Sequence, residues 1–131
     1  NVFVPLANAL MQEGDTVRAK EVLTKCLKVI NPKVVPYDVY SLRLVEALYK
    51  IGMTREADDI NKLVTNNAMN LIVWMLNLDN DKLQRLMKSG ELYRAYQTAS
   101  MGIKLAQENN RPILTQEEAK LNKYLTTLQA N

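Results

Sequence analysis

Three acidic runs are the first places in this sequence where side chains of one kind could do chemistry together. Asp58-Asp59 and Glu117-Glu118 are adjacent pairs, and Asp79-Asn80-Asp81 has the spacing that opens some calcium loops. Adjacent residues of a helix point in different directions, so we do not expect either pair to act as a catalytic dyad. The third run lacks the glycine and the distal glutamate of a calcium loop, and we interpret it as a helix cap.

Cys26 is the only cysteine, and the sequence contains no histidine. A single thiol without histidine does not make a zinc site, and it lacks the usual base of a cysteine nucleophile. We therefore expect Cys26 to be a small buried residue. The four glycines are at least twelve residues apart, which excludes a glycine-rich phosphate loop. These features predict a protein that is not an enzyme and uses neither a metal nor another cofactor.

The 131 residues carry a net charge of +3, and their basic residues are spread along the chain among acidic ones. The sequence has no dense basic stripe with interleaved aromatics, so we expect no nucleic-acid partner. The longest apolar run, Leu71 to Leu76, is far shorter than the roughly 20 residues that span a bilayer. We expect no membrane insertion by this chain.

The composition favours helices, because glycine and proline are scarce and leucine, lysine, alanine and glutamine are abundant. Helices would therefore have to position any functional side chain. A repeat organises them. Each repeat has a leucine four residues before a glycine and an alanine five residues after it, and the glycines are 38 residues apart: Leu10, Gly14, Ala19; Leu48, Gly52, Ala57; Leu86, Gly90, Ala95. A glycine can end a helix, and a small residue on the returning helix lets two helices approach closely. We predict helical hairpins over residues 3–30 and 38–65, with turns at Gly14 and Gly52.

The first hairpin resembles the tetratricopeptide repeat. Its matching positions are Phe3, Leu6, Ala7, Leu10, Ala19, Leu23, Cys26 and, one residue late, Pro32. In the second hairpin Leu44, Val45, Leu48, Gly52, Ala57 and Val64 fall in register, whereas Ser41 and Asn61 replace bulky core residues. The spacing exceeds the family's period of about 34 residues. We assign the extra residues to an extended connector over 31–37, followed by Asp38 as the next helix cap.

The resemblance implies a concave surface, lined by the first helix of each hairpin, that binds a protein or a peptide. The family's groove positions fall on Asn8, Met11, Gln12, Leu42, Arg43, Glu46, Tyr49 and Lys50. Arg43, Glu46 and Lys50 also share one helix face by their spacing. The alternative interpretation is an ordinary solvated face with a Glu46–Lys50 ion pair.

We expect residues 66–131 to form a helical cap on the same domain, which gives an all-α superhelix, or short solenoid, of about seven helices. Trp74 should be buried on a stripe with Leu71, Met75 and Leu78. Gly90 either makes a third hairpin turn or lies within one long helix from Asp81 to Glu108, and we favour the long helix. Four methionines, Met69, Met75, Met87 and Met101, should be core. Tyr93 and Tyr96 are either core, which we favour, or a partner-binding patch.

A narrower resemblance involves Phe3-Val4-Pro5-Leu6-Ala7, Val35-Pro36-Tyr37-Asp38 and Leu83-Gln84-Arg85-Leu86-Met87. With the order of the hairpins, these segments resemble the tail of multi-pass, glycosyltransferase-like membrane proteins of Bacteroidota. Because the sequence begins at Asn1 without an initiator Met, we expect it to be part of a longer protein. This resemblance implies an upstream membrane domain and a tail at the periplasmic face of the inner membrane. The alternative function is then an accessory tail that positions an acceptor or partner subunits.

Overall fold

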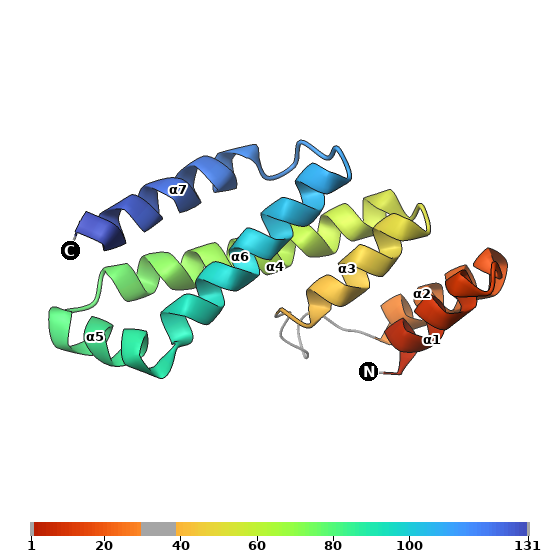
Figure 1. Cartoon of the computed structure of the whole chain (residues 1–131), viewed down its shortest axis with the longest axis horizontal. Coiled ribbons are helices and arrows are strands. Elements are labelled where there is room, and N and C mark those ends of the chain that lie inside the picture. Colours follow the sequence, from red (N-terminus) through yellow and green to blue (C-terminus); the bar gives the residue numbers. More distant parts are fainter. Residues whose placement is uncertain (1, 30–38, 131) are drawn as a thin grey trace. The chain divides into compact units, whose positions relative to one another are not determined.

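The computed structural model describes residues 2–29 and 39–130, and these residues form seven α-helices and no strand (Figure 1). The helices are α1 (Phe3–Gln12), α2 (Thr16–Val29), α3 (Ser41–Lys50), α4 (Thr54–Leu76), α5 (Asn80–Ser89), α6 (Glu91–Glu108) and α7 (Thr115–Ala130). The predicted all-α class is confirmed. The predicted connector over 31–37 and the cap at Asp38 lie outside the described residues. The chain divides within α4 into two compact units, Asn1–Ile60 and Asn61–Asn131.

Two helical turns of the same design organise the first unit. Gly14 and Gly52 have φ angles of +83° and +85°, which L side chains rarely adopt. After α1, the Gly14 amide donates to the Met11 carbonyl at 3.1 Å and the Asp15 amide donates to the Leu10 carbonyl at 2.8 Å. The turn after α3 repeats both bonds 38 residues later. These pairs satisfy the last carbonyls of each helix, so the predicted turns at the two glycines are confirmed.

Small residues lie at the helix contacts of the first unit, as their spacing predicted. Ala19 and Ala57 are completely buried, each five residues after its glycine. Leu23, Leu48 and Cys26 are also completely buried. Cys26 therefore has the structural place that we expected, a small side chain within the core.

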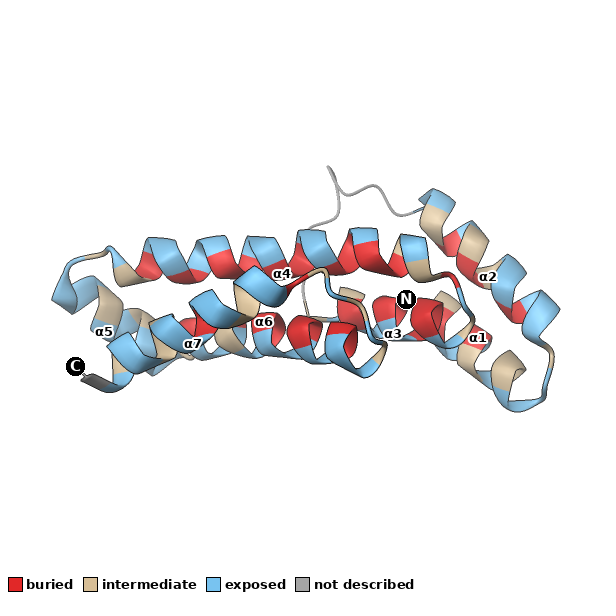
Figure 2. Cartoon of the chain, turned by 90° about the horizontal axis from the view of Figure 1, so that it is seen from above, coloured by how far each residue is buried: buried red, intermediate tan, exposed pale blue. Residues whose placement is uncertain are grey.

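The second unit packs residues 61–76 of α4 with α5, α6 and α7. Its core contains Ala68, Met69, Ile72, Met75, Leu92, Ala95, Ala99, Ile103, Ala106, Leu114 and Leu121. Figure 2 shows the buried sides of this part of α4 and of α6 turned toward each other. Alanines on α6 let the larger α4 side chains fill the space between the two helices.

The predicted long helix from Asp81 to Glu108 is wrong, because Gly90 breaks it. Gly90 has a φ angle of +84° and separates α5 from α6, which pack against each other. A left-handed residue cannot continue a right-handed helix, so the chain reverses there. The short arm before the turn contributes Leu83 and Leu86, which are partly buried against the core of the second unit.

The predicted burial of Trp74 is also wrong. α4 is one continuous helix through residue 76, and it places Ile72 and Met75 in the core. Trp74 is 58% exposed and Leu71 is 44% exposed. The apolar run from Leu71 to Leu76 covers every side of the helix, and only one side can face the core.

Candidate partner-binding surfaces

The predicted groove residues do not form one open surface. Gln12, Arg43, Glu46 and Lys50 are exposed, and Asn8 and Met11 are half-buried. All six lie in the first unit, on α1 and α3, and α1 packs against α3. Their role in binding stays a prediction.

Leu42 and Tyr49 must be removed from the predicted groove, because both are buried in the first unit. The Tyr49 hydroxyl donates a 2.7 Å hydrogen bond to Oδ1 of Asp58, which is itself buried. This bond joins α3 to the start of α4 across the Gly52 turn. The family's repeat pattern assigned Tyr49 to the groove, because a polar partner nine residues later leaves no signal in such a pattern. Asp59 is exposed, so the adjacent carboxylates of Asp58 and Asp59 do point apart.

The exposed charges on α3 are already engaged within the chain. Lys50 Nζ lies 3.0 Å from Glu46 Oε1, and both side chains are more than half exposed. An exposed pair of this kind contributes only about 0–1 kcal/mol to stability. The Arg43 guanidinium lies over the Tyr40 ring, 5.8 Å from its centroid. This arrangement matches the alternative that we gave for α3, a solvated face with an ordinary ion pair.

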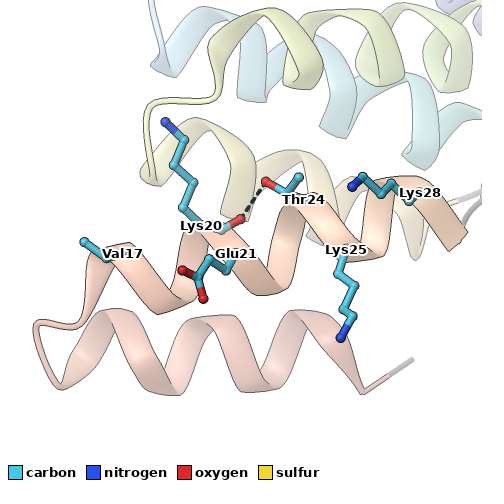
Figure 3. Close-up of a pocket in the computed structure, with 6 residues that line it drawn as sticks. All are labelled: Val17, Lys20, Glu21, Thr24, Lys25 and Lys28. Carbon is cyan, nitrogen blue, oxygen red and sulfur yellow. Dashed lines mark hydrogen bonds between the residues drawn. The ribbon is translucent and has the colours of Figure 1, made fainter.

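A hollow of about 560 Å³ lies along α2 and is lined by Val17, Lys20, Glu21, Thr24, Lys25 and Lys28 (Figure 3). The Thr24 hydroxyl donates to the Lys20 carbonyl at 2.8 Å, so that hydroxyl is used within the helix. Figure 3 shows Lys20 and Lys25 extending to opposite sides of α2. Because these ammonium groups diverge, the hollow does not offer convergent donors to a single ligand group.

A second hollow, of about 410 Å³, lies in the second unit where α4 ends and α5 begins. We call it the Trp74 hollow, and its lining residues are Trp74, Leu78, Lys82, Arg85 and Leu86. Three apolar side chains and two cations come together here from the end of α4, the start of α5 and the turn between them. The apolar run in the sequence identified this segment, but packing decided which side of the helix faces the core.

The aromatic and sulfur-containing residues of the second unit divide between core and surface. Met69 and Met75 are buried, as predicted, but Met87 and Met101 are 42% and 45% exposed. Tyr93 is 63% exposed and Tyr96 is half-buried, so the favoured core assignment is wrong for Tyr93. On α6 the core side is already occupied by residues such as Leu92, Ala95 and Ala99, so Tyr93 and Met101 face solvent on the other side.

The third acidic run, Asp79-Asn80-Asp81, lies at the start of α5. Asp79 is the N-cap of α5, where its side chain accepts a 3.0 Å hydrogen bond from the Lys82 amide, so the predicted helix cap is confirmed. Within residues 2–29 and 39–130, no three His, Cys, Asp or Glu residues come together in a way that could hold a metal ion.

No helix in the described part of the chain combines the length and the apolar character needed to cross a bilayer. Comparisons with protein-family models, with curated proteins and with solved structures found no match.

Proposed function

We propose that this chain is a non-catalytic helical module that binds a protein or a peptide. The observation that carries the proposal is the outward face of α4 in the second unit. Its inward face fills the core with Ile72 and Met75, yet Leu71 and Trp74 remain 44% and 58% exposed on the other side. A helix that is apolar on more than one side is normally covered on both.

The exposed residues also have the composition of an interface. Tryptophan and arginine are the residue types most often found as energetic anchors, and Trp74 and Arg85 line the same hollow. Large exposed apolar residues that lie together commonly mark interaction sites. Leu71 precedes Trp74 by three residues, which places both on neighbouring positions of one helix face.

A photo-crosslinking experiment tests the proposal in the cells that produce the protein. A photoreactive phenylalanine analogue replaces Leu71 in one variant and the exposed Lys120 on α7 in a matched control. We expect a discrete covalent adduct with another protein from position 71 and none from position 120. Identical adducts from both positions, or none from position 71, would contradict the proposal.

A further inference from the structure

The charge of the chain is not shared equally between its two units. Residues 1–60 contain eight Lys and Arg and eight Asp and Glu, whereas residues 61–131 contain nine Lys and Arg and six Asp and Glu. The whole net charge of +3 therefore belongs to the second unit. A positive field around an apolar hollow favours partners with acidic side chains.

Two cations lie at the Trp74 hollow beside an apolar floor. The floor consists of Trp74, Leu78 and Leu86, and Leu86 also packs on the core of the second unit. Lys82 Nζ lies 3.6 Å from Asp79 Oδ2, an exposed pair that only partly neutralises it. The Arg85 side chain is exposed, and its guanidinium makes no hydrogen bond or ion pair with any residue that the structure describes. Its five donors are thus available to an acceptor from outside the chain.

We infer that the Trp74 hollow binds an acidic amphipathic peptide, and this inference rests on the proposed function. An aliphatic or aromatic side chain of the peptide enters between Trp74 and Leu86. Carboxylates that flank this anchor pair with Arg85 and Lys82. A guanidinium can hold a carboxylate through two parallel hydrogen bonds, which fixes the direction of the bound peptide as well as strengthening it.

Other occupants fit the same surface less well. Recognition of an anionic membrane surface typically uses clusters of about four to eight Lys and Arg, and this hollow has two. Single-stranded nucleic acid is held by successive aromatic platforms along a basic groove, and Trp74 is the only aromatic residue here. A second copy of the chain would bring another unit of net charge +3 against the first, and like charges oppose that association.

Selection from a displayed library of short random peptides tests the inference. Four purified proteins are compared, namely the parent, Trp74→Ala, Arg85→Glu and the matched charge control Lys120→Glu. We expect the parent and Lys120→Glu to enrich peptides that combine acidic residues with large apolar ones. Trp74→Ala and Arg85→Glu should not enrich them, although circular dichroism should show that both variants remain folded.

The strongest enriched peptide is then titrated while the emission of Trp74, the only tryptophan, is recorded. Binding should shift the emission to the blue, and Arg85→Glu should weaken binding about tenfold or more, the loss expected for one charge-assisted contact. A peptide in which one acidic residue is changed to lysine should bind Arg85→Glu better than it binds the parent. This reversal of preference is not expected if Arg85 is only a solvated residue of α5.

Several results would overturn the inference, and they differ in what they leave standing. Enriched peptides without an acidic excess, or equal binding to Arg85→Glu and Lys120→Glu, would refute the acidic partner. Arg43→Ala is a fifth protein, used only to test the enriched peptides. Peptides that bind Trp74→Ala normally but fail with Arg43→Ala would move the site to the first unit and preserve the proposed function. A blue shift of the Trp74 emission with phosphatidylglycerol vesicles but not with peptides would indicate that the hollow binds a membrane surface. Self-association of the protein in analytical sedimentation would indicate that it binds a second copy of the chain. No enrichment by any protein would contradict both proposals.

Discussion

Replacing Gly102 by alanine tests the contact between α4 and α6 inside the second unit. Asn61 and Thr65 are completely buried on α4, and Asn61 Nδ2 donates a 2.9 Å hydrogen bond to the Gly102 carbonyl on α6. The Thr65 hydroxyl in turn donates to Asn61 Oδ1 at 3.1 Å. A methyl group on Gly102 would overlap with Thr65 Oγ1 and would lie only 2.7 Å from Asn61 Oδ1. Glycine therefore permits the close approach on which this polar contact depends.

The size of the effect follows from three opposing contributions to the free energy of unfolding. Alanine is intrinsically better than glycine within a helix by about 1 kcal/mol. Overpacking typically costs about 1–3 kcal/mol, and leaving the buried Asn61 amide without its bond costs about 1–3 kcal/mol more. We expect Gly102→Ala to lower the stability by about 1–5 kcal/mol, since the two losses together outweigh the helix gain.

Urea denaturation followed by circular dichroism measures this change. Ser100→Ala, at an exposed position of the same helix, is the matched control and should change stability by about 0.5 kcal/mol or less. Gly102→Ala should cost less in a Thr65→Ala background, where the hydroxyl that it meets is gone. Equal or higher stability of Gly102→Ala, or the same cost in both backgrounds, would refute the proposed contact.

Three further substitutions test other parts of the fold by thermal or urea denaturation. Ala19→Leu should destabilise by about 1–3 kcal/mol through overpacking, and an unchanged melting temperature would show that Ala19 is not at a helix contact. Tyr49→Phe removes the hydroxyl donor to buried Asp58 and should cost about 1–3 kcal/mol; a neutral result would mean that this bond contributes nothing. Trp74→Ala should cost about 1 kcal/mol or less, well below the roughly 3–5 kcal/mol of a buried aromatic, and parent Trp74 should be readily quenched by acrylamide. Blue-shifted, protected emission from the monomeric protein would contradict that exposure.

Local sequence signals predicted the turns of the first unit well, because residues close together in the chain determine them. Gly14 and Gly52 allow the positive φ angle that the turn bonds require, whatever surrounds them. Ala19 and Ala57 follow at a fixed spacing, so the helix contact is also encoded locally. Gly90 makes the same kind of turn, but apolar residues at helical spacing continue on both sides of it. A glycine within a helix costs only about 1 kcal/mol, so the pattern alone did not distinguish a break from a tolerated residue.

The candidate groove was predicted only in part, and the stacking of hairpins into a superhelix stays a prediction. The family's groove positions identified the exposed residues Arg43, Glu46 and Lys50, but also the buried residues Leu42 and Tyr49. The buried Tyr49 hydroxyl bonds to Asp58, which only the folded hairpin brings within hydrogen-bond distance. Polar partners at such spacings leave no periodic signal in a single sequence.

The amino-acid sequence by itself determined the helical class, the turns at Gly14 and Gly52, the small helix contacts and the cap at Asp79, because each depends on residues close together in the chain. Tertiary structure decided which side of α4 is buried. The Leu71–Leu76 run is apolar all round, so periodicity cannot select a side. That selection comes from α6, where Gly102 accepts a bond from Asn61, 41 residues away. Seating Asn61 and Thr65 against Gly102 fixes the rotation of α4, and that rotation turns Ile72 inward and Trp74 outward.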